Sequence, residues 1–500
     1  MLYCVPMAAI PKDAGAVILL TDPDDPKVFW VKRNPKLQFM GGYHAFPGGQ
    51  LDKSDSEISV EGCEGEQAWM RACAVRELFE ETGVLLARGA DRLSSSELSS
   101  LRSSTEDASQ FNAALVEHDL VIDASFLEAA GRWVTPPFAP RRFDTWFFLS
   151  WLPNGQDARV VKGELAEGEW IRPAEAYDRW KRGEIIMAPP TLHIIKTLAL
   201  HSNNIDGLAK ALSAVPEAGR GLVIRIELRP GIFMFPLKTP TLPPATHTNC
   251  YIVGGEEIIV IDPASPYEEE QKRLDGFLED LAEEGRRVRE IFLTHHHYDH
   301  VAGANYLRDR LGVGVAAHRL TAERLSGSVQ IDRVVDDDEL IEIKGDPGWR
   351  LRVLHTPGHT RGHICFYEEI TGAILTGDLV VGVGTVVIDP PEGDMLQYFD
   401  SLRRLLALPK LSSLFPAHGP AIGFAEPKIN EYIVHRTMRE NKILDAVRSG
   451  CATTSEIVAA AYTDVAPAMH GLAERSTMAH LDKLLAEGRV SRNGSRFGAT

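Results

Sequence analysis

The stretch IFLTHHHYDHVAG, residues 291–303, places four histidines and an aspartate within six consecutive positions, directly after a short apolar run. The run Ile-Phe-Leu predicts the end of a buried strand, because short β-branched and aromatic runs bounded by polar residues are typical of strands. Side chains alternate along an extended backbone, so we expect His295, His297 and Asp299 to point one way. His296 would point the other way and take no part in the cluster.

Three later stretches contain further histidine or aspartate residues where an apolar run becomes a loop. His359 follows a Pro-Gly turn in HTPGHTRGH, Asp378 ends the run AILTG, and His418 follows LFPA. Imidazoles and carboxylates are ligands that zinc accepts readily. The first cluster alone cannot complete a site, so the four stretches together predict a metal centre.

This pattern resembles the metallo-β-lactamase superfamily. The resemblance implies an αββα sandwich, in which two β-sheets pack together with helices outside and metal ions lie at one edge. It further implies a hydrolase with two zinc ions, one on His295, His297 and His359 and the other on Asp299, His300 and His418, with Asp378 bridging them. Asp299 and Asp378 are the candidate catalytic residues of this half.

Other polar residues of this region have weaker patterns. A single histidine near an apolar strand is usually structural, and we expect this for His247, His318 and His355. His363, four residues after His359, is a candidate substrate contact, and so is Asn249 in HTNCYIVG.

The first half of the chain has an independent pattern, YHAFPGGQLD at 43–52 followed by AVRELFEETGVLL at 74–86. Helical spacing puts Glu77, Glu80 and Glu81 on one side of a helix that Gly83 would end. Clustered carboxylates repel one another, and a hard cation such as Mg²⁺ or Mn²⁺ compensates for this.

This pattern resembles the Nudix hydrolases, which cleave diphosphate linkages on an α/β/α fold. The resemblance implies that the three glutamates hold Mg²⁺ or Mn²⁺ and act in catalysis. The segment from Gly49 to Arg76 is longer than the family spacing by 13 residues, and Glu61, Glu64 and Glu66 compete for the role of the loop glutamate. A non-catalytic nucleotide-binding module is therefore the alternative for this half.

Further segments, RRFDTWFFLSWLP, EWIRPAEA and APPTLHIIKTL, are similar to the RP2-like Nudix proteins, some of which are coenzyme A diphosphatases. The coenzyme A signature expects an arginine five residues after Arg33, where this chain has Gln38. The diphosphate substrate is thus a nucleoside diphosphate or a coenzyme A derivative, and Arg33 is a candidate contact to it.

The domain limits follow from changes in composition along the 500 residues. We expect a Nudix domain at 1–205 with an insertion at about 88–125, a linker at 206–221, a metallo-β-lactamase domain at 222–426 and a winged-helix-like domain at 427–500. Residues 222–500 resemble the β-lactamase-like protein 2 family, which has such a C-terminal domain and a member that cuts single-stranded RNA. The fold class is therefore multidomain α/β.

Composition limits the partners of the chain. The net charge of −17 and scattered cysteines without a Cys-x-x-Cys pair indicate a reduced, cytoplasmic protein that does not coat nucleic acid or membranes. No apolar run approaches membrane-spanning length. We predict a bifunctional hydrolase, with a phosphodiester such as single-stranded RNA as the substrate of the zinc half. The alternative for that half is an acyl-coenzyme A or glyoxalase II-like thioesterase. The sequence indicates no particular oligomeric state.

Overall fold

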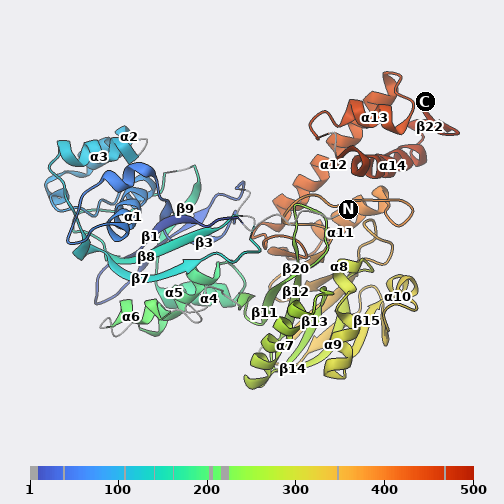
Figure 1. Cartoon of the computed structure of the whole chain (residues 1–500), viewed down its shortest axis with the longest axis horizontal. Coiled ribbons are helices and arrows are strands. Elements are labelled where there is room, and N and C mark those ends of the chain that lie inside the picture. The colour runs from blue at the N-terminus through green and yellow to red at the C-terminus, as the bar shows by residue number, and fades with distance from the viewer. Residues whose placement is uncertain are drawn as a thin grey trace. The chain divides into compact units, whose positions relative to one another are not determined.

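The computed structural model describes residues 9–37, 40–105, 108–139, 141–161, 163–201, 207–214, 225–345, 348–466 and 469–500. The chain forms two compact units, residues 1–230 and 231–500, which Figure 1 shows in one colour gradient. Among the described residues, every helix is too short or too polar to cross a membrane.

A mixed sheet with helices on both faces forms the first unit (Figure 1). Its central order is β3-β2-β1-β8-β7, with β4 paired to β1 and β9 paired to β2. The strands are β1 (Lys12–Leu20), β2 (Val28–Arg33), β3 (His44–Ala45), β4 (Gly48–Gln50), β7 (Glu128–Val134), β8 (Phe143–Trp151) and β9 (Leu165–Ile171).

Strand β1 explains why this sheet is covered on both sides. Val17 and Leu19 pack into a core that includes helix α1 (Glu66–Thr82), whereas Ile18 and Leu20 face a second core. Helices α4 (Pro173–Lys181), α5 (Pro189–Leu200) and α6 (Leu208–Ser213) contribute to that second core. A strand that is buried on both faces needs apolar side chains on both of them, and residues 17–20 of β1 supply these.

The predicted insertion forms two helices, α2 (Ser95–Ser104) and α3 (Ala108–Glu117), which bury leucines and Phe111 against the α1 side of the sheet. The long segment before α1 joins this insertion, since β5 (Val60–Glu61) pairs with β6 (Ile122–Asp123). Short 3-10 turns η1 (Lys53–Glu57), η2 (Ala90–Arg92) and η3 (Ala124–Phe126) complete the unit.

The sequence placed a linker at 206–221, but part of this stretch is packed structure. Leu208, Ala209 and Leu212 of α6 are buried in the second core, and the hydroxyl of Ser213 donates to the carbonyl of Ala129. The apolar spacing over six residues was too short to predict a helix. Residues 206 and 215–221 of the expected linker lie outside the described residues. Strand β10 (Ile226–Arg229) comes last in the first unit.

Two sheets packed face to face form the main body of the second unit. Within residues 231–500, the strands of the first are, in order, β11 (Ile232–Lys238), β12 (His247–Gly254), β13 (Glu257–Ile261), β14 (Arg287–Leu293), β15 (Gly314–His318) and β16 (Arg333–Val335). The second contains β17 (Leu340–Ile343), β18 (Trp349–His355), β19 (Ile364–Glu368), β20 (Ala373–Gly377) and β21 (Ser413–Pro416). Phe292 and Phe366 meet between them with ring centroids 5.5 Å apart.

Helices cover the outer faces of this sandwich. With the first sheet lie α7 (Glu268–Glu283), α8 (Tyr298–Val301), α9 (Ala304–Leu311) and α10 (Arg319–Leu325), and α11 (Met395–Leu406) packs on the second. The predicted αββα sandwich and α/β/α domain are both confirmed.

A single helix, α12 (Ala425–Arg448), joins the sandwich to the C-terminal domain. Its first half packs on the second sheet through Ala425 and Ile429, and its last turns pack into a separate core. That core contains α13 (Thr454–Ala461), α14 (His470–Ala486) and the hairpin β22 (Val490–Asn493) and β23 (Arg496–Ala499). The predicted winged-helix-like fold, with its hairpin at Asn493-Gly494, is confirmed.

Candidate metal centres

The four histidine and aspartate stretches meet at one edge of the sandwich, where strands end. Strand β14 ends at Leu293, β20 ends at Gly377, directly before Asp378, and β21 ends two residues before His418. His359 lies in the loop between β18 and β19. Because these strand ends share an edge, residues far apart in the sequence become neighbours.

The side chains of the HHHYDH stretch do not alternate as an extended strand would. The backbone leaves the strand at Thr294, and His297 caps the short helix α8, which carries Asp299 and His300. Asp299 therefore faces a different set of residues from His295 and His297. A helical turn of four residues, too short to be revealed by periodicity in the sequence, explains the difference.

Two groups of candidate ligand atoms result. One contains His295, His297, His359 and Asp378, and the other contains Asp299, His300 and His418, with the atoms of each group within 4.8 Å of one another. All seven residues predicted as zinc ligands are thus brought together.

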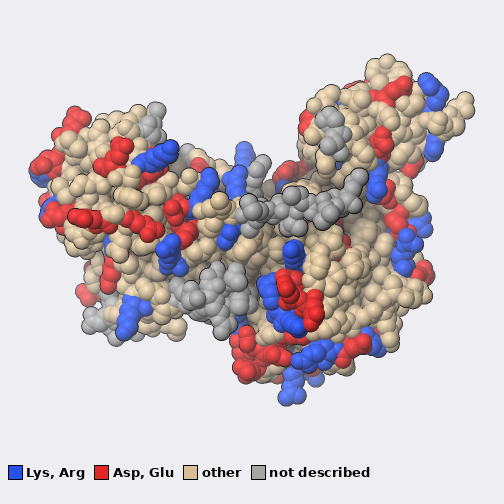
Figure 2. All heavy atoms as spheres, in the orientation of Figure 1, with Lys and Arg blue, Asp and Glu red and all other residues tan. Residues whose placement is uncertain are grey.

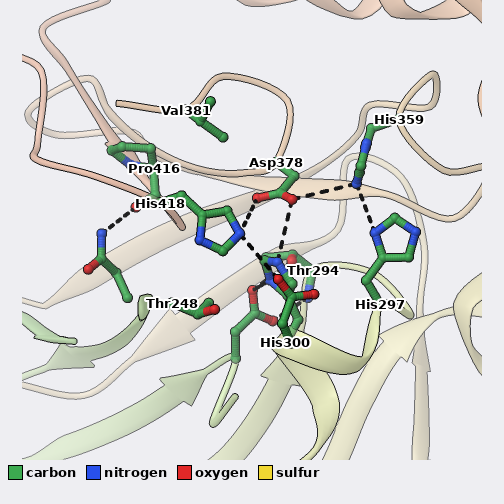
Figure 3. A network of polar contacts seen from close by, with 12 residues as sticks. Thr248, Thr294, His297, His300, His359, Asp378, Val381, Pro416 and His418 are labelled. Carbon is green, nitrogen blue, oxygen red and sulfur yellow. Dashed lines mark hydrogen bonds and ion pairs between the residues drawn. The ribbon is translucent and has the colours of Figure 1, made fainter. Parts of the chain in front are cut away.

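Asp378 lies between the two groups, as Figure 3 shows. Its Oδ2 is 3.6 Å from Nε2 of His359 and 3.5 Å from Nε2 of His300. Its Oδ1 is 3.4 Å from Nε2 of His418. One carboxylate is therefore within reach of both groups.

The remaining ring nitrogens fix the orientation of four imidazoles. Nδ1 of His295 lies 3.0 Å from Oγ1 of Thr294, and Nδ1 of His300 lies 2.9 Å from Oδ2 of Asp262. Nδ1 of His359 lies 2.8 Å from the Val387 carbonyl, and Nδ1 of His418 lies 2.9 Å from the His247 carbonyl. Carbonyl and carboxylate oxygens accept, so Nδ1 donates and Nε2 is turned into the site.

The first group has more acceptors than hydrogens. Nε2 of His295 and Nε2 of His359 both lie 3.0 Å from Nδ1 of His297. A single N–H cannot donate along both directions, so at least one lone pair faces another nitrogen. Nε2 of His300 and Oδ1 of Asp378 are also buried without a hydrogen-bond partner among the described residues. A cation between these atoms satisfies all of them, so the donor set fits a metal.

The electrostatics agree with this donor set. Burial lowers the pKa of His359 to about 3, and burial and neighbouring histidines hold the pKa of His295 well below its usual value. Both imidazoles are therefore neutral, as metal ligands must be. Burial would also lower the pKa of His300, but the carboxylates of Asp378 and Asp262 outweigh it and raise that pKa. The second group thus attracts positive charge.

Two residues predicted as substrate contacts have structural positions instead. His363 is fully buried, its Nε2 accepts from the backbone N–H of Asp378 at 3.1 Å, and its Nδ1 contacts Thr356 Oγ1 at 2.9 Å. The side-chain amide of Asn249 donates to the carbonyls of Pro416 and Gly419, each at 2.8 Å. Both residues hold the loops that carry Asp378 and His418. Spacing alone could not show which side of the loop they occupy.

Asp262 is a residue of this site that the sequence analysis missed. Its carboxylate accepts from the N–H and hydroxyl of Thr294 at 2.8 and 2.7 Å, in addition to His300. The signal was an aspartate directly after the apolar run of β13, the same kind of strand end that identified Asp378.

In the first unit, the glutamates predicted on one helix side lie together at the C-terminal end of α1. The guanidinium of Arg76 contacts Glu77 at 2.8 Å and Glu80 at 3.1 Å, and Glu81 accepts from the N–H of Gly48 at 2.9 Å. Burial raises the pKa of Glu77 to about 7 and that of Glu81 to about 8. Burial removes the water that would stabilise their charge, so such carboxylates bind a proton or a cation instead.

The acidic partner expected in the loop is an aspartate outside the candidates. Asp55 pairs with Arg76, whereas Glu61, Glu64 and Glu66 lie beyond it along the chain. Asp55 follows Gly49 by the family spacing of five intervening residues, so the extra residues come after the acid. The distance from Gly49 identifies this position, but the family pattern has a glutamate there and this chain has an aspartate.

Arg33, the candidate contact for a diphosphate, lies at the end of β2 and forms an ion pair with Glu164 at 3.0 Å. Its charge also lowers the pKa of Glu81 in part, against the larger effect of burial. Arg33 is therefore close to the carboxylates. Gln38 lies outside the described residues.

Comparisons with known proteins match three segments of the chain. Residues 243–418 match the metallo-beta-lactamase superfamily, residues 60–198 match the NUDT19 Nudix domain, and residues 453–499 match the beta-lactamase associated winged helix domain. Both hydrolase families generally use divalent metals.

Three curated relatives match the second half. The Beta-lactamase-like protein 2 homolog of Drosophila melanogaster is 30% identical over 49% of this chain and 84% of its own length. Atrochrysone carboxyl ACP thioesterase AgnL7 of Paecilomyces divaricatus is 31% identical over 45% of this chain and 67% of its own. Hydroxyacylglutathione hydrolase of Pelagibacter ubique is 33% identical over 32% of this chain and 60% of its own.

These matches and the geometry at the sandwich edge lead to one assignment. The chain is a metal-dependent hydrolase that belongs to the metallo-β-lactamase superfamily, with a Nudix domain of the NUDT19 type before the sandwich and a winged-helix domain after it.

Proposed function

We propose that the second unit is a dinuclear zinc hydrolase that cleaves a thioester. The observation that carries the dinuclear assignment is the position of Asp378, whose two carboxylate oxygens reach ligand atoms of both groups. His295, His297 and His359 would hold one ion, and Asp299, His300 and His418 the other, with Asp378 shared. Imidazole and carboxylate ligands suit zinc.

Zinc ions, when bound at these groups, would lower the pKa of a water molecule and would polarise the bond to be cleaved. The protein contributes orientation. Asp262, Thr294 and the carbonyls of Val387 and His247 hold the imidazoles, and His363 holds the backbone of Asp378.

Relatives support a thioester as the substrate class. Two of the three named above are a thioesterase and a hydroxyacylglutathione hydrolase. A phosphodiester, the substrate expected from the sequence, is the second candidate. It is favoured by the C-terminal winged helix and by the likeness to the β-lactamase-like protein 2 family, since the sequence analysis expects a member of that family to cut single-stranded RNA. On the face in Figure 2, acidic and basic side chains are interspersed over the C-terminal helices, a pattern that favours neither candidate.

We further propose that the first unit hydrolyses a nucleoside diphosphate or coenzyme A derivative, with Glu77, Glu80 and Glu81 holding Mg²⁺ or Mn²⁺. The half-buried position of the three carboxylates supports this, with Glu77 and Glu80 against Arg76 and Glu81 on the N–H of Gly48. Arg33 would contact the diphosphate. The alternative is a non-catalytic nucleotide-binding unit.

The zinc proposal is tested on the purified full chain by metal analysis and by release of free thiol from acyl-coenzyme A and acylglutathione. We expect about two zinc ions per chain and thiol release that Asp378→Ala abolishes. Fewer than one zinc ion per chain would refute the dinuclear site. Cleavage of single-stranded RNA without thiol release, lost in Asp378→Ala, would favour the second candidate.

The Nudix proposal is tested by Mg²⁺-dependent hydrolysis of coenzyme A and nucleoside diphosphate derivatives. Replacing Glu80 and Glu81 together with glutamine removes two charges at little cost in volume. We expect hydrolysis to fall to background while thiol release by the other unit is unchanged. Hydrolysis that survives both substitutions, or is never seen, contradicts the proposal.

A further inference from the structure

Helix α12 contacts the loop that follows Asp378 at two points, one turn apart on the same side of the helix. The hydroxyl of Tyr432 donates to the Val381 carbonyl at 2.9 Å and accepts from the N–H of the same residue at 3.1 Å. One turn later, Arg436 donates to the carbonyl of Val386 and contacts Thr385 Oγ1 at 3.4 Å. The helix therefore holds this loop at both ends of the stretch 381–386.

The next residue of this loop orients a candidate zinc ligand. The Val387 carbonyl accepts from Nδ1 of His359 at 2.8 Å, and this bond turns Nε2 of His359 into the first group. Arg436 thus donates to the carbonyl of one residue, and the carbonyl of the next residue orients His359. A shift of the Val386 peptide moves the Val387 acceptor with it.

Arg436 is fixed in this position. Its side chain is 4% exposed and its guanidinium lies 5.5 Å from the ring centroid of Tyr398. Among the described residues, no carboxylate lies within ion-pair distance of Arg436. A buried cation whose partners are a backbone carbonyl, a hydroxyl and an aromatic face holds that carbonyl strongly, because no carboxylate of the described residues pairs with it.

The second group is oriented by other parts of the sandwich. His300 is held by Asp262, directly after β13, and His418 by the His247 carbonyl of β12. The contacts of Arg436 are with Thr385, Val386 and Tyr398 and do not involve these residues. A loss at Arg436 should therefore affect the two groups unequally.

We propose that Arg436 is a positioning residue through which helix α12 fixes His359 in the metal centre. The inference rests on the proposed zinc site, and it adds a role in assembling that site for the helix that joins the sandwich to the C-terminal domain. Removing the guanidinium should lower the zinc affinity of the site formed by His295, His297 and His359 by about 10- to 100-fold. This is the range typical for the loss of a residue that hydrogen-bonds to a metal ligand.

The test is chelator competition on the full chain, with zinc release followed by a colorimetric indicator. In wild type we expect two zinc ions released at similar chelator concentrations. In Arg436→Ala one ion should leave at a concentration about 10- to 100-fold lower, while the other leaves as in wild type. The absorption spectrum of the cobalt-substituted protein should change for one ion. Arg436→Lys should restore part of the affinity.

Arg439→Ala is the matched control. Arg439 lies on the same helix, is also buried, and pairs with Asp464 at 3.0 Å inside the C-terminal domain. It should lower stability without changing release of either ion. If Arg436→Ala does not fold, Arg436→Gln, which keeps a donor, is measured in the same way.

Equal release of both ions from wild type and the folded Arg436 variant would overturn the positioning role alone. Equal weakening of both ions, or the same loss in Arg439→Ala, would also overturn it, because that result indicates general loosening. Wild-type protein without zinc would instead refute the proposed function.

Discussion

Arg76 and Asp55 form a bidentate ion pair, with Nε 2.7 Å from Oδ1 and Nη2 2.9 Å from Oδ2, and their side chains are 6% and 0% exposed. The pair joins turn η1 to helix α1 across the 20 intervening residues. It leaves Nη1 of Arg76 for Glu77 and Glu80. Asp55 thus fixes the guanidinium of Arg76, which contacts Glu77 and Glu80.

Breaking this pair should destabilise the first unit strongly. Asp55→Asn leaves the buried guanidinium without its full charge partner, and we expect a loss of about 3 to 5 kcal/mol in the free energy of unfolding. Seven of the eight tryptophans lie in residues 1–230, so urea unfolding followed by tryptophan fluorescence reports on this unit. Asp52→Asn is the control, because asparagine caps η1 as well as aspartate does. An equal loss in both variants would contradict the prediction.

Gly49 tests the position of Glu77. A Cβ at Gly49 would lie 2.4 Å from the Glu77 carboxylate, so Gly49→Ala must displace that side chain. We expect Mg²⁺-dependent diphosphate hydrolysis to fall at least about tenfold, because a misplaced ligand weakens metal binding. Gly163→Ala, where a Cβ meets nothing within 4 Å, should have no effect. Full activity of Gly49→Ala would argue against Glu77 as a metal ligand.

The sequence predicted the convergence of the candidate metal ligands in the sandwich better than their surroundings. Asp378 and His418 follow apolar runs and His359 follows a Pro-Gly turn, and strand ends at one sheet edge converge whatever the loop lengths. Strand alternation grouped Asp299 with His295 and His297, whereas the family resemblance grouped it with His300 and His418, as in the structure. Alternation failed because helix α8 begins at Tyr298, and four residues are too few to show a helical period. The Val387 carbonyl and the contacts of His363 depend on loop conformation, which side-chain pattern does not encode.

His296 and His297 differ sharply although they are adjacent. The imidazole of His297 contacts both His295 and His359, whereas His296 belongs to neither group of ligand atoms. His297→Ala should therefore lower the zinc content from about two ions to one or fewer and abolish hydrolysis by the second unit. His296→Ala should keep both ions. Metal analysis of the two purified variants separates them, and equal zinc contents would refute the assignment.

The C-terminal core contains a buried carboxylate whose charge should make stability depend on pH. Glu440 of α12 contacts Lys483 at 2.9 Å, Arg489 at 3.1 Å and His480 at 3.4 Å, and its side chain is 6% exposed. Burial would raise its pKa, but His480 and Lys483 outweigh burial and lower the pKa to about 2. The ionised form therefore stabilises the fold.

Because the folded pKa lies below the ordinary value of 4.5, this stability is present above pH 4.5 and is lost as pH falls toward 2. Glu440→Gln resembles the protonated acid, so it should cost about 3 kcal/mol near pH 6, and the cost should shrink between pH 4.5 and 2. Burial lowers the pKa of His480 and its contact with Glu440 opposes this, so the substitution changes both groups, and the measured quantity is the pH-dependent difference between the two proteins. Hydrogen exchange of the amides of α14 measures it locally. A difference that stays constant from pH 6 to pH 3 would show that the charge of Glu440 does not stabilise this core, and that the substitution acts only through packing.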